Sequence, residues 1–327
     1  MIKHLSWWGL FVFITKQRRE NKMTDRFIED KQNVFETEKG KFDLKTLLSG
    51  GFIKQRQKDL FTIRCRVPAG RLDAKKMKKI AEVAEKYGRG FVHLSFRQSA
   101  EIPYVNIKDF AAVTKELSEV GQTIASCGPR VRAITACGGC EYNPNGLTDT
   151  QGIAIEMDRR FFGTDTPHKF KISFSGCPID CARTREMDLG FQGIVEPVWE
   201  ESSCDGCTLC AKACKEGAIV SDEDGKPVFD PEKCIYCGDC IRVCPSESWK
   251  AKRYGHMVRV GGKHGRHPRE ADVVRIFISD EEVPSVIESV VKWYQENGIK
   301  RERLGMTIER LGLEKFKEGV FGEKEVE

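Results

Sequence analysis

The stretch that decides the fold begins with Thr135-Ala136-Cys137-Gly138-Gly139-Cys140 and ends with Ser175-Gly176-Cys177-Pro178-Ile179-Asp180-Cys181. Its four cysteines form two close pairs, and several thiolates converging on one small volume are the ligands that an iron–sulfur cluster requires. Just before the second pair, Lys169 and Lys171 stand on alternate residues of a predicted strand, so they share one face of it. The sequence therefore predicts a redox metal site beside a cationic wall, which suits an anionic substrate that receives electrons.

Residues 200–248 carry eight more cysteines, in two identical C-x2-C-x2-C-x3-C runs. This is the spacing of bacterial two-cluster ferredoxins, in which the fourth cysteine of each run ligates the other cluster. One predicted 4Fe–4S cluster therefore lies on Cys204, Cys207, Cys210 and Cys244, and the other on Cys234, Cys237, Cys240 and Cys214. Zinc sites are the alternative, because C-x2-C pairs also bind zinc, but four cysteines per run favour iron–sulfur clusters. Asp224-Gly225, between the two runs, is predicted to form a turn.

Length and composition bound the class of protein. The chain has 327 residues, 40% hydrophobic and 31% charged, as expected for a globular protein of two or three units. The net charge of +5 comes with no dense Lys/Arg tract, so nothing points to nucleic acid. Fourteen cysteines in a chain of this length favour metal ligation over a secreted disulfide scaffold. We therefore expect a protein of the reducing cytoplasm.

The N-terminal segment, residues 1–45, is predicted to be an extension of the folded chain. It contains an apolar run of ten residues, Leu5–Ile14, followed by basic side chains. This run is too short to span a bilayer, and no small-residue cleavage site follows it. We expect translation to start at Met23, with a membrane-surface anchor as the alternative.

Residues 46–125 are predicted to form a β-α-β-α unit, a ferredoxin-like half-domain. Residues 59–67 and 91–97 alternate as strands; in the second, Val92, Leu94 and Phe96 are predicted to face inward. Helices are expected over residues 73–87, with Met77 on the buried stripe, and over 107–120. Arg64, Arg66 and Arg97 fall on the opposite faces of these strands. They are either solvated or functional, and the same alternation at Lys169 and Lys171 favours function.

The C-terminal part adds a basic loop and two helices. The loop runs from Lys263 to Arg269 and is either a solvated hairpin or a site that neutralises carboxylates. Helices are predicted from about Pro284 to Asn297 and over residues 300–318. Both are expected to pack without taking part in the chemistry.

These stretches together resemble the sirohaem-dependent sulfite and nitrite reductases, and most closely their single-repeat anaerobic and dissimilatory-type members with an inserted ferredoxin domain. The resemblance covers most of residues 55–270. The matching motifs are Ile63-Arg64-Cys65-Arg66-Val67-Pro68-Ala69-Gly70, Ser95-Phe96-Arg97-Gln98, Lys169-Phe170-Lys171, Gly176-Cys177-Pro178 with Cys181, and the ferredoxin block.

The resemblance implies an α+β fold. The half-domain would be followed by a sirohaem/4Fe–4S domain in two parts, residues 126–199 and 249–327, separated by the ferredoxin insert at 200–248. The implied anion cage consists of Arg64, Arg97, Lys169 and Lys171. Residues implied to pair with the carboxylates of sirohaem are Arg132, Lys263, Arg266, His267 and Arg269. The implied ligands of the sirohaem-coupled cluster are Cys137, Cys140, Cys177 and Cys181, with Cys181 bridging to the haem iron.

The chain departs from the family at the first cysteine pair. The family spacing is C-x5-C, whereas Cys137 and Cys140 are spaced C-x2-C, and Asn143 stands where the second cysteine is expected. Either Cys140 is the ligand through a reshaped loop, or another group such as Cys127 takes its place.

The implied activity is multi-electron reduction of sulfite to sulfide, with sirohaem and three 4Fe–4S clusters as cofactors. Nitrite reduction at the same site is one alternative, and a sirohaem-free electron-transfer subunit is another. The implied partners are an external low-potential electron donor and either further copies of the chain or a homologous subunit. Neither a nucleic acid partner nor a membrane span is expected.

Overall fold

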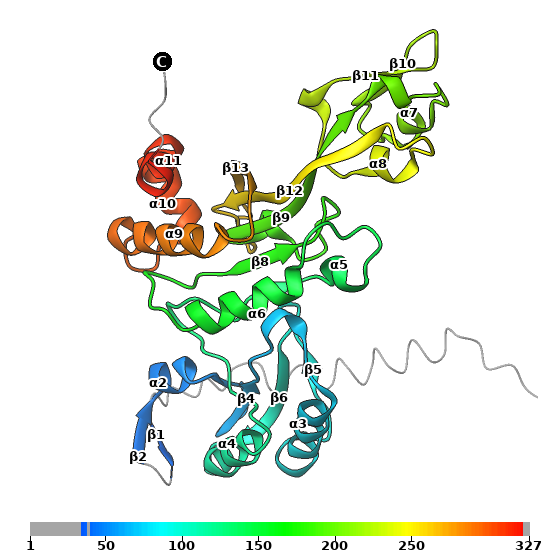
Figure 1. Ribbon diagram of the computed structural model, residues 1–327. Coiled ribbons are helices and arrows are strands. Elements are labelled where there is room, and N and C mark those ends of the chain that lie inside the picture. Colours follow the sequence, from blue (N-terminus) through cyan, green and yellow to red (C-terminus); the bar gives the residue numbers. More distant parts are fainter. Residues whose placement is uncertain (1–33, 38–39, 323–327) are drawn as a thin grey trace, which may run out of the picture.

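The computed structural model describes residues 34–37 and 40–322 (Figure 1). The expected start at Met23 and the apolar run Leu5–Ile14 lie outside these residues. Across the described residues, no helix combines the length and the apolar character that crossing a membrane would need.

The N-terminal unit is a four-stranded antiparallel sheet with two helices, preceded by a hairpin and a short helix. The sheet has the order β3-β4-β6-β5, and its core includes Phe61, Ile63, Val83, Ile102 and Leu117. The elements are β1 (Val34–Thr37), β2 (Gly40–Asp43), α2 (Leu44–Ser49), β3 (Phe52–Lys54), β4 (Leu60–Arg64), η1 (Pro68–Gly70), α3 (Ala74–Tyr87), β5 (His93–Leu94), β6 (Ala100–Asn106), η2 (Ile107–Asp109) and α4 (Phe110–Ser118). The predicted β-α-β-α unit is thus confirmed.

Two details of this unit differ from the prediction. Leu94 and Phe96 are 74% and 65% exposed rather than inward, because the strand stops at Leu94 and the chain turns at once. Ser95 and Ser99 close that turn through their hydrogen bonds. Met77 is 57% exposed, since the buried stripe of α3 runs instead through Ile80, Val83 and Ala84.

The second unit is built on a five-stranded mixed sheet of order β13-β12-β9-β8-β7. β7, β8 and β9 are parallel to one another, whereas β9, β12 and β13 are antiparallel. Helix α6 packs beside β7 and β8, and α9, α10 and α11 pack together. The elements are β7 (Thr135–Ala136), α5 (Gly139–Tyr142), α6 (Thr150–Phe161), β8 (Ile172–Ser175), η3 (Thr184–Glu186), β9 (Leu189–Trp199), β12 (Trp249–Val260), β13 (Asp272–Ile278), α9 (Val283–Asn297), α10 (Leu304–Leu311) and α11 (Leu313–Phe321).

The single C-terminal helix predicted over residues 300–318 is wrong. The chain forms two helices there, α10 and α11, and Gly312 joins them. The φ of Gly312 is +95°, a conformation that L side chains rarely adopt but that glycine adopts readily. The helix predicted from Pro284 to Asn297 is confirmed as α9.

Residues 200–248 form a separate lobe at the far ends of β9 and β12 (Figure 1). Asp224-Gly225 makes the predicted turn, between β10 and β11, with Gly225 at φ +78°. Buried Cys210, Ile219, Cys240 and Trp249 make a small core. The elements are η4 (Glu201–Ser203), α7 (Leu209–Ala213), β10 (Ile219–Ser221), β11 (Pro227–Phe229), η5 (Pro231–Lys233) and α8 (Asp239–Val243).

The half-domain is tied to the second unit at β7, directly before Cys137. The side chain of Gln98 hydrogen-bonds both the N–H and the C=O of Ala136, at 3.0 and 2.6 Å. Arg66 donates to the carboxylate of buried Asp158 at 2.8 Å, and the other oxygen of that carboxylate accepts from Ile134 N–H at 2.9 Å. Arg66 therefore holds the two units together, and the start of the cysteine stretch is fixed from both sides.

Candidate anion cavity and cysteine centres

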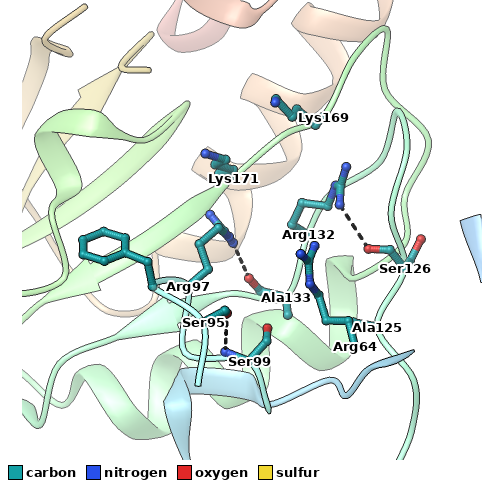
Figure 2. A pocket seen from close by; sticks show the side chains of 11 residues that line it. Arg64, Ser95, Arg97, Ser99, Ala125, Ser126, Arg132, Ala133, Lys169 and Lys171 are labelled. Atoms are coloured by element: carbon teal, nitrogen blue, oxygen red, sulfur yellow. Dashed lines mark hydrogen bonds between the residues drawn. The ribbon is translucent and has the colours of Figure 1, made fainter. Parts of the chain in front are cut away.

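Five cations line one cavity of about 290 Å³ where the half-domain meets the second unit (Figure 2). They come from four segments: the end of β4, the 95–99 turn, the 125–133 segment and residues 169–171, which precede β8 and lie outside it, although the sequence predicts both lysines on that strand. The five are Arg64, Arg97, Arg132, Lys169 and Lys171, and the remaining lining residues are Ser95, Phe96, Ser99, Ala125, Ser126 and Ala133. Folding thus gathers all four residues of the predicted cage, together with Arg132.

Backbone carbonyls hold two of the guanidinium groups in place. Arg97 donates to Ala133 O at 2.6 Å. Arg132 donates to Gly128 O at 2.8 Å and to Ser126 O at 3.3 Å, while its buried Nε has no partner. These carbonyls orient the arginines without cancelling their charge.

Arg64 and the two lysines differ in how they are paired. Arg64 forms an ion pair with Glu101 at 2.8 Å and also donates to the sulfur of Cys127 at 3.3 Å. Within the described part of the chain, the ammonium groups of Lys169 and Lys171 have no carboxylate partner. The two lysines therefore remain available to an anion, as do Arg97 and Arg132, whose hydrogen-bond partners are uncharged.

Crowding and burial weaken the hold of these groups on their protons. Burial, followed by the neighbouring Arg97 and Arg303, lowers the pKa of Lys171 to about 8. Burial also lowers the pKa of Arg97 to about 10 and, with Arg303, that of Lys169. Desolvation disfavours a charged amine, and like charges add to that effect. The cavity thus combines strong anion attraction with ammonium groups that release their protons more readily than ordinary lysines do.

Sequence reasoning missed a buried ion pair that acts on this cavity. Arg303, at the start of α10, donates twice to Asp188, at 2.8 and 2.7 Å. The two residues are 115 positions apart, so no local pattern signals the pair.

The basic loop does not bring its predicted side chains to the cavity wall. The guanidinium of Arg269 is engaged with Asp272 and Glu309, at 2.5 and 2.8 Å. Lys263, Arg266 and His267 are not among the lining residues, and Arg266 and His267 are exposed. His264, also in the loop, lies 2.7 Å from Glu186 and edge-on to the ring of Phe96.

The Cys137–Cys181 stretch brings three of its four thiols into electrostatic range of one another. Cys137 and Cys181 both raise the pKa of Cys177, after the larger effect of burial. The sulfur of Cys137 accepts from Gly176 N–H at 3.1 Å and from Gly139 N–H at 3.4 Å. A Cβ on Gly176 would lie 2.8 Å from Gly139 Cα, so glycine is required where the two loops meet.

The two candidates for the fourth ligand lie in different surroundings. Cys140 is exposed on α5, and Cys127 is buried beside Arg64 at the cavity. Asn143 ends α5 and accepts from Asn145 N–H at 3.0 Å. No three His, Cys, Asp or Glu side chains of the described residues converge on a single metal ion. A 4Fe–4S cluster does not require such convergence, because each thiolate binds a different iron.

The lobe separates its eight cysteines into two cavities, in the crossed arrangement that the spacing predicts. Cys204, Cys207, Cys210 and Cys244 line one cavity. Cys214, Cys234, Cys237 and Cys240 line the other. A donor set of four sulfurs fits a 4Fe–4S cluster in each.

The Cys181 loop reaches the rim of the cation cavity. The guanidinium of Arg183, two residues after Cys181, lies 4.1 Å above the ring of Phe96, which lines the cavity. An iron–sulfur centre on this loop and an anionic cofactor in the cavity would therefore be neighbours. The unpartnered Arg132 Nε and the surplus of cations fit such a cofactor.

Comparison with known proteins agrees with this arrangement. Residues 127–327 match the nitrite and sulphite reductase 4Fe-4S domain, and residues 53–120 match the nitrite/sulfite reductase ferredoxin-like half domain. The chain is 35% identical over 273 residues to the coenzyme F420-dependent sulfite reductase of Methanocaldococcus jannaschii. The match covers 83% of this chain but only 44% of that protein.

Two further relatives span most of the chain. The assimilatory-type sulfite reductase of Nitratidesulfovibrio vulgaris is 23% identical over 83% of this chain and 97% of its own length. The crystal structure of dissimilatory sulfite reductase I superimposes with a TM-score of 0.69 at 21% identity, covering 82% of this chain and 70% of that one. The predicted resemblance is thus confirmed: the chain belongs to the sirohaem-dependent nitrite and sulfite reductase family, as a ferredoxin-like half-domain followed by the 4Fe–4S domain.

Proposed function

We propose that this protein reduces sulfite to sulfide at a sirohaem coupled to a 4Fe–4S cluster, with nitrite as an alternative substrate. The observation that carries the proposal is the five-cation cavity with two unpaired lysines, next to the Cys181 loop. A small oxyanion loses its hydration when it is buried, so it binds only where cations replace the water. The cavity provides such cations, and both sulfite and nitrite are small oxyanions of this kind.

The protein's own groups would bind the anion and supply protons. Arg64 and Arg97 would hold the anion, and Lys169 and Lys171 would donate protons as its oxygens leave as water. The bound sirohaem and its cluster would supply the electrons. Cys137, Cys177 and Cys181 are proposed as ligands of that cluster, with Cys140 as the fourth, and Arg132 as a partner of the sirohaem carboxylates. Lys263, Arg266, His267 and Arg269 are proposed as further partners of those carboxylates.

We further propose that the 200–248 lobe relays electrons, and that the cluster on Cys214, Cys234, Cys237 and Cys240 passes them on. Gly238 follows Cys237, and a Cβ built on Gly238 would lie 2.8 Å from Val195 and 3.8 Å from Leu147. Leu147 N–H donates to Gly176 O at 2.7 Å, and Gly176 directly precedes Cys177. This series of contacts supports an order in which the cluster of Cys204, Cys207, Cys210 and Cys244 receives electrons first from an external low-potential donor.

The test is an anaerobic visible spectrum with an iron count, followed by sulfite-dependent oxidation of a reduced viologen. The proposal predicts isobacteriochlorin bands and about thirteen irons per chain, about twelve from three cubanes and one from the haem. Iron–sulfur absorption alone, after expression with sirohaem supplied, would support the sirohaem-free electron-transfer subunit instead. The missing C-x5-C cysteine is the observation that favours this second candidate.

Assembly and location stay predictions. Sedimentation of the holoprotein as a single chain would contradict the expected homo-oligomer or pairing with a homologous subunit. Fractionation of native cells would test the expected cytoplasmic location.

A further inference from the structure

A buried ion pair stands behind the cation cavity. Asp188 is 0% exposed and Arg303 is 7% exposed, and two hydrogen bonds join the guanidinium to both carboxylate oxygens. Such a bidentate pair is stable only when both partners are present, because either charge alone would be buried without compensation.

The same carboxylate also holds the backbone of Lys171. Lys171 N–H donates to Asp188 Oδ2 at 2.9 Å, and Leu189 N–H donates to Lys171 O at 3.1 Å. Both the N–H and the C=O of Lys171 are therefore held, by Asp188 and Leu189 respectively. Arg303, in turn, is held at the N-cap of α10, where its carbonyl accepts from Thr307 N–H.

We propose that Asp188 and Arg303 form the positioning pair of Lys171, which holds the lysine in the cavity and sets the pH at which it gives up its proton. This inference rests on the proposed function, in which Lys171 is a proton donor. Because Arg303 occupies both oxygens of Asp188, the carboxylate does not close on the Lys171 ammonium. The ammonium thus stays available to an anion.

The two members of the pair act on Lys171 in opposite directions. Burial and Arg97 lower the pKa of Lys171 most; Arg303 and Lys169 lower it further, and Asp188 raises it. His264, from the basic loop, is a further charged group in range, since Lys171 lowers the pKa of His264. Removing the carboxylate should therefore make Lys171 more acidic, and removing the guanidinium should make it less acidic.

The experiment is competitive acetylation of the holoprotein by acetic anhydride across a pH series, with the label at Lys171 measured by mass spectrometry. Only the neutral amine attacks the anhydride, and acetate leaves, so the half-labelling pH reports the proton on the lysine. Lys75, exposed on α3, is the reference within each sample. We expect Asp188→Asn to move the half-labelling pH down and Arg303→Gln to move it up.

Two further variants keep the test decisive if a single variant fails to fold. Arg303→Lys keeps the cation and should leave the half-labelling pH close to wild type. The Asp188→Asn/Arg303→Gln double variant removes both charges of the pair, and its half-labelling pH should fall between those of the single variants. Unchanged values, or shifts in the same direction in both single variants, would overturn the proposal. Labelling requires no turnover, so absent sirohaem bands would count against the proposed function and not against this pair.

Discussion

The cation cavity and the 200–248 lobe are two candidate functional regions built in opposite ways. In the lobe, eight cysteines come from two short runs, and each of the two cavities draws on both runs. The cation cavity draws its five charges from segments that span residues 64 to 171, and its electrostatic balance depends on Asp188 and Arg303 as well. A metal site can thus be encoded by spacing within one module, whereas a site for a small anion requires several elements to meet.

The largest expected effect comes from removing a cysteine of the lobe while leaving the cation cavity unchanged. Cys240→Ser removes a buried ligand candidate that is also part of the small lobe core, so we expect loss of one cluster, about four irons per chain, and loss of donor-driven turnover. Iron analysis and EPR measure the first effect. Cys65→Ala removes a buried thiol from the half-domain core and should leave the iron count unchanged. An unchanged iron count in Cys240→Ser would refute the assignment of Cys240 as a cluster ligand.

The next largest effect comes from changing the cation cavity while leaving the lobe unchanged. Lys171→Met removes an unpaired ammonium while leaving every cysteine in place, so the clusters should remain. The rate constant kcat for sulfite reduction should fall about 10²–10⁴-fold, the usual contribution of a general acid. Steady-state kinetics with reduced viologen measure this, and Lys75→Met, on the exposed face of α3, is the control. A Lys171→Met enzyme with normal kcat would contradict the role of the lysine.

A pH series sharpens the comparison without a mutation. A lysine with a pKa of about 8 is protonated below that pH and loses its proton above it. Turnover that needs this proton should be level below pH 8 and fall about tenfold per pH unit above it. In the lobe, electron transfer has no such requirement, so cluster reduction measured by stopped flow should show no matching decline. A decline of both rates together would place the titration elsewhere.

The smallest effect concerns the contact between the lobe and the second unit, where Gly238 lies against Val195 and Leu147. Gly238→Ala should push Cys237 away from Val195 and Leu147 and slow electron transfer from the lobe severalfold, as measured by rapid-freeze EPR. Gly217→Ala is the matched control: Gly217 has a similar positive φ, +65° against +75°, but a Cβ there meets no atom within 4 Å. Both variants share the backbone cost of alanine at positive φ, so equal rates in the two would disprove the proposed contact.

Prediction from the sequence succeeded where the signal is local. The turn at Asp224-Gly225, helix α9 and the strand before Cys177 follow from residue patterns that are complete within a few positions. Prediction failed where a turn or a single glycine interrupts the pattern. Phe96 alternates like an inward residue, but the 95–99 turn directs its ring outward, beneath Arg183. Residues 300–318 continue the helical pattern, but Gly312 breaks the helix.

The sequence alone determined the family and the spacing of its cysteines and cations, because these motifs lie within consecutive residues. Only the tertiary structure decided which cations share the cavity and which do not. Arg64 and Arg66 alternate in the sequence, which predicts that they share one face of a strand, yet β4 ends at Arg64, and Arg66 pairs with Asp158 while Arg64 lines the cavity. Arg269 is committed to Asp272 and Glu309, and Arg303 joins Asp188 across 115 residues. Ion pairs join residues that are far apart in the sequence, so the partner of each arginine is known only from the folded structure.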